Sequence, residues 1–390
     1  MSKTRIAVIG AGLGGTAAAA LLQGSGYNVK LYEQARAFSR LEAGIHLSPN
    51  VTKVMRRIGC EEALNAIGSR PDFWFNRHWK TAEPTAGIRL GDHALEAYGA
   101  GYLTVHRGDL HALMTSVVAP HTIVFGKRLH ALEDTGYEMR MSFTDGTEEA
   151  ADLVIGADGL NSKVREHVLG EELPRYTGYV AHRAVLPASL LGYKSYDTCV
   201  KWWSNDRHML AYYINAKRSE YFYVTGVPQA EWAAGVSMMG SSREEMREAF
   251  VGFHADVQHL IDISPSVTKW PLFERDRSPL WSHGRMALLG DACRLLGPHM
   301  GQAAAMGIED AAMLTRCLDE AGVGDYTHAF ALYEANRSVR TASVQSASRT
   351  SEWLRSNEDP SWVYDYDVFN VPLAMPDVER FSTVSAAFRE

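Results

Sequence analysis

The stretch "RIAVIGAGLGGTAAAALLQGSGYNVKLYE", residues 5–33, decides the fold. Its apolar run at 6–9 predicts a strand, and the glycine-rich turn that follows leads into a helix over about 14–23. A second apolar run at 29–32 predicts another strand. Strand, turn, helix and strand in this order form the βαβ unit that opens a Rossmann-like sheet.

The turn carries a dinucleotide-binding pattern. Gly10, Gly12 and Gly15 fit G-x-G-x-x-G, in which the first glycine allows a tight turn, the second lets backbone approach a pyrophosphate, and the third lets helix pack on strand. Glu33 ends the second strand, where its carboxylate can accept hydrogen bonds from ribose hydroxyls. The stretch predicts an adenine dinucleotide and leaves FAD and NAD both open. The expected contacts are Gly10, Gly12, Gly14, Gly15, Glu33 and Gln34.

A second motif, "ADLVIGADGLNSKVRE" at 151–166, has an apolar strand over 153–155, then Asp158-Gly159 and a polar helix start. It resembles the aromatic-ring hydroxylases of the class A flavoprotein monooxygenases. In that family the aspartate lies near the flavin pyrophosphate, so the resemblance assigns Asp158 to the cofactor site. It also implies an α/β fold like that of para-hydroxybenzoate hydroxylase: a Rossmann-like FAD-binding domain with a ββα-type parallel sheet, and an antiparallel-sheet substrate domain.

A third motif of the same family is "LLGDACRLLGPHMGQAAAMGIEDAAML" at 288–314. The resemblance implies that Asp291 holds the ribityl hydroxyls of a flavin and that Pro298 shapes the loop beside the ring. Small residues up to Ala304 would let the positive end of the next helix approach the ring, which favours its anionic reduced form. Within that helix an apolar stripe at helical spacing predicts a core-facing side; it consists of Ile308, Ala311, Leu314 and Leu318.

The resemblance settles the choice of cofactor. Arg107 in "TVHRGDLHALM" matches the family's arginine before a short helix, near the flavin phosphates. Three ordered motifs that serve one cofactor imply FAD. The chain has no second G-x-G-x-x-G unit, so NADH is implied only as a transient co-substrate.

The composition narrows the partners and the class of protein. The 390 residues are 46% hydrophobic, enough for a large core, and the net charge of -7 without basic clusters argues against nucleic acid. We expect small-molecule partners (an aromatic acid, NADH and O2), with a homodimer left open. No apolar run reaches the ~20 residues of a membrane span, and the absence of a signal peptide predicts a cytoplasmic protein. We expect no metal. The four cysteines are too dispersed for a zinc site or a disulfide framework; they are Cys60, Cys199, Cys293 and Cys317.

Residues 171–275 lose the βα rhythm and form strand-like runs separated by short turns, which predicts an antiparallel sheet. The predicted FAD-binding domain is therefore discontinuous (1–70, 100–170 and 276–350), the substrate domain comprises 71–99 and 171–275, and 351–390 packs on the body. Period-two alternation groups the side chains of three strands into faces. These rows are Cys199, Lys201 and Trp203; His208, Leu210 and Tyr212; and Tyr221, Tyr223 and Thr225. A cavity walled by such faces suits a planar heteroaromatic acid.

Here the resemblance narrows to family members that act on hydroxypyridine carboxylates, through "CVKWWSNDRHMLAYY", "YVTGVP" and "EAGIHLSPN". It implies conversion of 6-hydroxynicotinate to 2,5-dihydroxypyridine and CO2 with NADH, FAD and O2, through a C4a-hydroperoxyflavin. The implied site residues are His46, His208, Tyr212 and His299 for catalysis, and Cys199, Leu210, Thr225 and Pro298 for substrate binding. A group with a pKa near neutral should sit at the ring hydroxyl, and we expect His208 or Tyr212 there. His46 or His299 would then serve the carboxylate or the peroxide, and Cys199 is expected to pack rather than react.

The sequence departs from the family pattern "GDACHPMKPHMAQG" at the third motif. Arg294, Leu295 and Gly297 replace its His, Pro and Lys, and Glu42 stands where a glycine is usual. Arg294 could place a positive charge near the flavin or a substrate carboxylate, or could point to solvent. Two alternatives therefore stay open: a hydroxylase of another phenolic or hydroxypyridine acid, and a flavin-binding protein that no longer hydroxylates. A plain NAD-dependent dehydrogenase is disfavoured, because the motifs of Asp158 and Asp291 would have no function in such an enzyme.

Overall fold

The computed structural model describes residues 4–40, 42–192, 198–233, 235–276, 278, 280–297, 300–350 and 359–376. A six-stranded sheet, in the order β18-β19-β11-β1-β2-β7, carries the βαβ unit. Its strands are β1 (Arg5–Ile9), β2 (Asn28–Glu33), β7 (Ile123–Phe125), β11 (Leu153–Gly156), β18 (Ser282–His283) and β19 (Met286–Leu288). All pair in parallel except the edge strand β18. The carboxyl ends of β1, β2, β11 and β19 thus meet along one edge, where ligands of such sheets bind.

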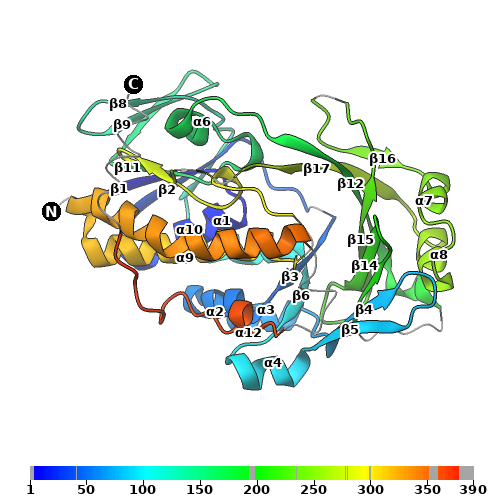
Figure 1. Cartoon of the computed structure of the whole chain (residues 1–390). Helices are drawn as coiled ribbons and strands as arrows, with labels where there is room; N and C mark the ends of the chain where they lie inside the picture. The colour runs from blue at the N-terminus through cyan, green and yellow to red at the C-terminus, as the bar shows by residue number, and fades with distance from the viewer. Residues whose placement is uncertain are drawn as a thin grey trace.

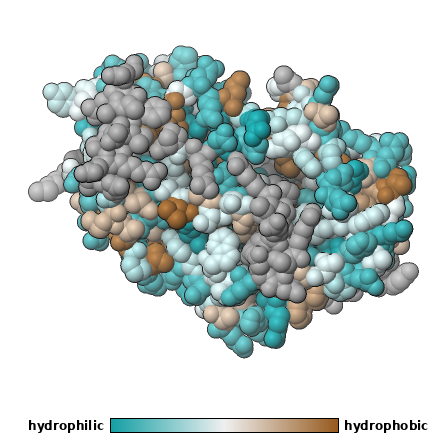
Figure 2. All heavy atoms as spheres, in the orientation of Figure 1, coloured by the Kyte–Doolittle hydropathy of each residue, from teal (hydrophilic) through white to brown (hydrophobic). Residues whose placement is uncertain are grey.

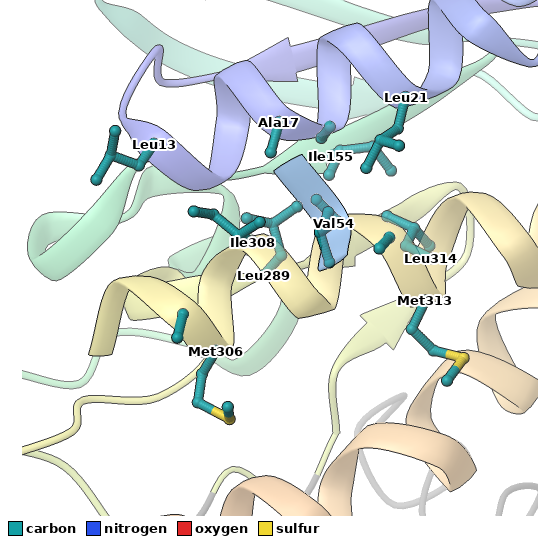
Figure 3. Packing of buried hydrophobic residues seen from close by; sticks show 14 of the residues in the cluster. Leu13, Ala17, Leu21, Val54, Ile155, Leu289, Met306, Ile308, Met313 and Leu314 are labelled. Atoms are coloured by element: carbon teal, nitrogen blue, oxygen red, sulfur yellow. The ribbon is translucent and has the colours of Figure 1, made fainter. Parts of the chain in front are cut away.

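Three helices cover this sheet: α1 (Leu13–Gly24), α9 (Ala303–Ala321) and α10 (Tyr326–Thr350). Figure 3 shows Ala17 and Leu21 of α1 on the side that faces α9, which presents Ile308 and Leu314. The predicted stripe from Ile308 to Leu318 is fully buried, which confirms the helical pattern. Burial of this apolar seam holds the starts of α1 and α9 in fixed positions.

The second sheet has eight strands in the order β16-β17-β12-β15-β14-β13-β4-β5. They are β4 (Phe73–His78), β5 (Pro84–Arg89), β12 (Arg175–Pro187), β13 (Cys199–Trp203), β14 (His208–Tyr213), β15 (Glu220–Pro228), β16 (Met239–Ser241) and β17 (Val267–Glu274). The predicted antiparallel sheet is confirmed, with one parallel pair between β13 and β4. The outer face packs on α7 (Arg243–Ala249) and α8 (Ala255–Asp262), and we call the opposite face, which carries Trp74, Cys199, Leu210 and Tyr212, the inner face (Figure 1).

Smaller elements connect the two sheets. The ribbon of β3 (Gly44–Leu47) and β6 (Leu103–His106) lies between the six-stranded sheet and the inner face (Figure 1). A three-stranded sheet is formed by β8 (Leu129–Asp134), β9 (Met139–Phe143) and β10 (Glu148–Ala151). The remaining helices are α2 (Pro49–Ile58), α3 (Glu61–Ile67), α4 (Gly91–Tyr98), α5 (Arg107–Ser116), α6 (Lys163–Leu169) and α12 (Ser361–Tyr364), with single turns at Gly159–Asn161, Ala188–Leu191, Gly290–Ala292 and Val323–Asp325.

These two sheets confirm the predicted fold class, a parallel cofactor sheet joined to an antiparallel one. The segment boundaries of the two domains stay a prediction. In the C-terminal part, Val363, Tyr364 and Val368 are buried against the body. On the face drawn in Figure 2, hydrophobic side chains are scattered among hydrophilic ones. Among the described residues, no helix is long and apolar enough to cross a bilayer.

Candidate active site and cofactor site

The glycine-rich turn is closed on one side and open on the other. Gly10 has φ +98°, and a Cβ there would lie 2.5 Å from the carbonyl oxygen of Ala157. A Cβ at Gly15 would lie 1.9 Å from the carbonyl oxygen of Gly10, so helix and strand pack without room for a methyl group. A Cβ at Gly12 would meet nothing within 4 Å. The turn is therefore packed where it holds the fold and free where a pyrophosphate would approach.

Glu33 is fixed beside this turn. One oxygen of its carboxylate accepts a hydrogen bond from the backbone N–H of Ala11 (2.9 Å) and the other from that of Ala35 (2.8 Å). The sequence analysis missed His111 of α5, whose Nε2 lies 2.6 Å from the carbonyl oxygen of Ala11. No local pattern marks a histidine that contacts a turn 100 residues away. Glu33 keeps lone pairs for ribose hydroxyls while it stabilises the turn.

A polar cavity of about 620 Å³ opens at this turn, within the usual range for ligand sites. Gly10, Gly12, Glu33, Gln34 and Asp158 all line it. The Asp158 carboxylate accepts hydrogen bonds from the Ser162 hydroxyl (2.5 Å) and from the N–H groups of Lys163 (2.7 Å) and Val164 (3.2 Å). Burial nevertheless raises the pKa of Asp158 above its ordinary value. Asp158 thus shapes the cavity wall through its own loop.

Arg107 and Asp291 are the two charged residues that the motifs assign to the phosphates and the ribityl chain of the cofactor. Arg107 begins α5 and Asp291 lies in the turn at Gly290–Ala292, as the motifs predict, and both side chains are exposed. Surrounding protein still desolvates both charges. Burial lowers the pKa of Arg107, which the charge of Asp291 opposes. Burial raises the pKa of Asp291, which the charges of Arg294 and then Arg107 oppose. Neither side chain makes a hydrogen bond or ion pair within the described part of the chain. Two accessible opposite charges inside the molecule fit the phosphates and hydroxyls of a dinucleotide.

The helices α1 and α9 begin without a side-chain hydrogen bond to their first turns. At α9, the amide of Gln302 is used elsewhere: it donates to the Ser48 hydroxyl (2.8 Å) and accepts from Asn50 (3.2 Å). The adjoining Ala304 is only partly buried. Both helix ends therefore offer free N–H groups to an anion. Pro298 and His299, predicted for this loop, lie outside the described residues.

His46 lies where β3 meets the inner face. Its ring is 4.1 Å from that of Tyr212 and 4.8 Å from that of Trp74, and its Nδ1 lies 3.0 Å from the hydroxyl of Tyr102. A Cβ at Gly301, just before α9, would lie 3.3 Å from the His46 side chain. Burial, reinforced by the charge of Lys201, lowers the pKa of His46 to about 3, so the imidazole is neutral at physiological pH. His46 therefore lies between the start of α9 and Tyr212.

The second ring nitrogen of His46 is a candidate hydrogen-bonding group for a bound substrate. Nε2 of His46 is buried and has no hydrogen-bond partner among the described residues. A buried polar atom without a partner costs about 1–3 kcal/mol. A bound substrate with a matching polar group would remove this cost.

The inner face brings together most of the predicted substrate contacts. The register of β13 with β14 pairs Lys201 with Leu210 and Trp203 with His208, so these rows share one side of the sheet with Tyr212. The ring of His208 lies 4.7 Å from that of Trp203. Trp74 of β4, which the sequence analysis missed, joins the row because β4 pairs with β13 in parallel. This pairing joins segments over 100 residues apart, which no local pattern reveals.

Tyr221, Tyr223 and Thr225 share one face of β15 as predicted, but this face lies on the outer side of the sheet and does not wall the expected cavity. Thr225 pairs with Met209, and its neighbours Tyr221 and Tyr223 pack in the outer cluster under α7 and α8. The Thr225 hydroxyl accepts a hydrogen bond from the N–H of His182 (2.9 Å) and faces away from the inner side. The alternation of residue types shows which residues of a strand share a face. The register set by the preceding turn decides whether that face lies on the inner or the outer side of the sheet.

Cys199 lies on the inner face and is fully buried. Burial raises the pKa of its thiol far above the ordinary value, so the thiolate that a nucleophile requires is not formed. All four cysteines are free and buried. Cys199 therefore packs, and any contact with substrate is apolar.

Arg294 points neither to solvent nor to the cofactor space. Its guanidinium is buried, lies 2.6 Å from the Asp310 carboxylate, and stacks 5.0 Å from the centre of the Trp281 ring. Asp310 also accepts from the N–H of Gly290 (3.0 Å) and from Arg337 (2.7 Å). Arg294 thus belongs to a buried ion network behind the Asp291 turn. Glu42, the other departure, is exposed, 3.8 Å from Arg40 and from His106.

Comparison with known proteins identifies the family of this chain. A family model described as "FAD binding domain" matches residues 3–348. A 6-hydroxynicotinate 3-monooxygenase of Pseudomonas fluorescens is 57% identical over 96% of this chain and 98% of its own. One from Bordetella bronchiseptica is 58% identical over 95% and 97%.

Solved structures share the fold. HpxO of Klebsiella pneumoniae, complexed with FAD and uric acid, superposes with a TM-score of 0.79 at 25% identity and covers 92% of this chain and 90% of its own. A salicylate hydroxylase substrate complex gives 0.76 at 26% identity over 99% and 93%. The family model spans the glycine turn, Asp158 and Asp291, and the relatives are monooxygenases over nearly their whole length. The chain therefore belongs to the FAD-binding-domain family and is an FAD-dependent aromatic monooxygenase.

Proposed function

We propose that this enzyme hydroxylates 6-hydroxynicotinate at the carbon that bears the carboxylate. The reaction consumes 6-hydroxynicotinate, NADH, O2 and two protons, and gives 2,5-dihydroxypyridine, CO2, NAD+ and water. The observation that carries the proposal is the 57–58% identity, over at least 95% of this chain, to two 6-hydroxynicotinate 3-monooxygenases. The inner face supports it, because an aromatic surface with a few polar groups suits a planar heteroaromatic acid.

The bound FAD would be held by the glycine turn, Glu33, Arg107 and Asp291, and it would supply the activated oxygen. Burial raises the pKa of Tyr212 well above its ordinary value, so its phenol stays protonated and can donate a hydrogen bond. This leaves His208 as the proposed base for the ring hydroxyl. Neutral His46 would hydrogen-bond the substrate through Nε2. We keep His299 as a proposed catalytic residue and Leu210 and Pro298 as proposed substrate contacts.

The test is NADH-dependent O2 uptake by the FAD-loaded enzyme with 6-hydroxynicotinate, with the product mass measured in the same sample. We expect stimulated NADH oxidation, release of CO2 and gain of one oxygen. Stimulation by another hydroxylated aromatic acid alone would favour the wider substrate class. FAD-loaded protein that no such acid stimulates would indicate a flavin-binding protein without hydroxylase activity.

The remaining assignments concern the location, the partners and the oligomeric state of the enzyme. We propose a cytoplasmic location, with the aromatic acid, NADH and O2 as its partners, and neither nucleic acid nor membrane among them. Light scattering on the purified holoenzyme would decide between monomer and homodimer.

A further inference from the structure

Two neighbouring rings at the inner face each keep an unsatisfied nitrogen. His46 Nε2 and Trp74 Nε1 are buried, and neither has a hydrogen-bond partner among the described residues. The centres of the two rings lie 4.8 Å apart. The indole nitrogen is only a donor, so the group that satisfies Trp74 must be an acceptor. Because a buried donor without a partner is unfavourable, this pair indicates a ligand that brings acceptor atoms.

A tyrosine contacts the other nitrogen of His46. In the ribbon of β3 and β6, His46 pairs with Thr104, so Tyr102, two residues before Thr104, is its diagonal neighbour on the same face. The Tyr102 hydroxyl lies 3.0 Å from Nδ1 of His46, and the Tyr102 side chain is buried. The His46 ring is neutral, so one of its nitrogens donates and the other accepts. The direction of the bond to Tyr102 therefore decides which nitrogen carries the proton.

Tyr102 is held in place by distant parts of the chain. Its ring packs on that of Tyr364 in α12, with ring centres 5.7 Å apart, and the hydroxyls of the two tyrosines interact. The carbonyl oxygen of the preceding Gly101 accepts a hydrogen bond from the Thr52 hydroxyl of α2 (2.9 Å). Burial raises the pKa values of both tyrosines, so both phenols keep their protons. Tyr102 therefore presents an O–H group at a fixed position beside Nδ1.

The indole of Trp74 determines the direction of the bond to Tyr102. If the proton of His46 were on Nδ1, an acceptor that bonds Trp74 would meet the lone pair of Nε2, and two acceptors repel each other. With the proton on Nε2, both rings donate to the same group. Nδ1 is then the acceptor and the Tyr102 hydroxyl the donor. A carboxylate suits this arrangement, because its two oxygens can accept both N–H groups in charge-assisted hydrogen bonds.

We propose that His46 and Trp74 bind the carboxylate of the substrate, and that Tyr102 is a positioning residue that keeps the His46 proton on Nε2. This inference rests on the proposed function and assigns one end of the substrate within it. No proton is transferred on binding, since two N–H groups donate to the carboxylate oxygens. Neutral donors orient the carboxylate without the strong ground-state attraction of a cation, which would oppose its loss as CO2.

The first measurement determines the position of the proton by nitrogen NMR of FAD-loaded enzyme with isotope-labelled histidine. The chemical shifts separate protonated from unprotonated ring nitrogens, and the signals absent from His46→Gln are those of His46. We expect the wild type to carry the proton on Nε2, with Nδ1 unprotonated and hydrogen-bonded. In Tyr102→Phe the Nδ1 signal should shift, because its hydrogen bond is lost. A wild type with the proton on Nδ1 would overturn the inference, and this result needs no Tyr102 variant to fold.

The second measurement compares two fragments of the substrate through their effect on the flavin spectrum. Nicotinate carries the carboxylate without the ring hydroxyl, and 2-hydroxypyridine carries the hydroxyl without the carboxylate. For Tyr102→Phe and for Trp74→Phe we expect nicotinate to bind about tenfold more weakly, and 2-hydroxypyridine to change by less than about twofold. In the His46→Gln background, where an amide N–H replaces the Nε2–H, Tyr102→Phe should weaken nicotinate binding by less than about twofold more.

Trp202→Phe and Tyr98→Phe are the matched controls. Trp202 also has a buried indole nitrogen without a partner among the described residues, but it packs in the outer cluster. Tyr98 packs on Tyr364 with ring centres 5.6 Å apart. Both controls should bind both fragments as the wild type does. Equal losses for the two fragments in Tyr102→Phe, or additive losses in the His46→Gln background, would reduce Tyr102 to a structural role. A wild type that binds nicotinate but is not stimulated by 6-hydroxynicotinate would refute the proposed function separately.

Discussion

At the residue scale, two glycines of the same turn have different roles. Gly12 leaves space for the cofactor, and Gly15 allows close packing of the helix on the strand. Gly12 has φ −70°, which alanine can adopt, and its Cβ position is empty. We expect Gly12→Ala to leave the stability of the apoprotein unchanged and to weaken FAD binding by about tenfold or more, because the methyl group would stand between the pyrophosphate and the N–H groups of α1. Urea unfolding of the apoprotein and titration of FAD fluorescence measure the two effects.

Gly15→Ala is the control for that variant. Its methyl group would lie 1.9 Å from the Gly10 carbonyl oxygen, so the backbone must move. Overpacking of this kind costs about 1–3 kcal/mol or more of folding stability. If Gly12→Ala destabilised the apoprotein as much as Gly15→Ala, the turn would not be open on its ligand side.

His46 predicts an acid-sensitive step in stability. Its pKa is about 3 in the folded protein and 6.5 in the unfolded chain, so both states are neutral above pH 6.5. Between pH 6.5 and 3 only the unfolded chain takes up the proton, and stability therefore falls as the pH falls. At pH 5 this loss is about 2 kcal/mol. Urea unfolding at pH 7.5 and 5 should show a smaller decrease for His46→Gln than for the wild type.

The exposed His130 on β8 provides the comparison for that measurement. His130→Gln should reproduce the wild-type decrease between the two pH values. A His46→Gln protein that lost as much stability as the wild type would show that the imidazole is protonated in the folded state.

At the element scale, the ion network beneath α9 ties the Asp291 turn to α10. Three guanidinium groups meet two carboxylates, namely Arg294, Arg337 and Arg340 with Glu309 and Asp310. Asp310→Asn would leave the arginines with one carboxylate and weaken the contact to Gly290. We expect a loss of about 3–5 kcal/mol in thermal unfolding, together with lower FAD content.

Arg294→Met tests the same network with the opposite charge change. It leaves two arginines with two carboxylates, and its apolar side chain can still pack on Trp281. The cost should therefore be much smaller than that of Asp310→Asn. Equal costs for the two variants would mean that the network does not depend on this balance of charge.

The sequence predicts those features that are determined within one segment of the chain, and it fails for those that depend on contacts between distant segments. The turn from Gly10 to Glu33 and the stripe from Ile308 to Leu318 lie within single periodic segments, and their elements appear as predicted. Thr225 and Arg294 depend on tertiary contacts. The register with Met209 turns the first to the outer face, and a carboxylate 16 residues further along buries the second. The partner of a buried charge and the face that a strand residue occupies both depend on contacts between distant segments. The sequence of a single segment therefore does not predict them.

At the scale of the whole molecule, the cofactor space is made by segments that no single unit contains. The glycine turn lines the polar cavity, Arg107 of α5 and the Asp291 turn come from two other parts of the chain, and we propose that all three hold one FAD. The substrate face belongs to the other sheet, and β3 carries His46 between them. Arg40 adds an exposed ion pair on each side, to Asp109 of α5 and Glu220 of β15. A ligand that contacts all three cofactor segments should therefore stabilise the molecule globally.

This arrangement predicts that FAD stabilises the fold and that Arg107 transmits part of the effect. FAD binds only the folded chain, so each hundredfold excess over its dissociation constant adds about 2.7 kcal/mol. In the apoprotein, however, the charge of Arg107 acts unfavourably on Arg183, and burial lowers the pKa of both groups. We expect Arg107→Met to leave the melting temperature of the apoprotein unchanged or slightly higher, and to reduce the increase that FAD produces. Scanning calorimetry over a series of FAD concentrations measures both quantities. A variant that lowers the apoprotein melting temperature while keeping the full FAD increment would show that Arg107 supports the fold and not the cofactor.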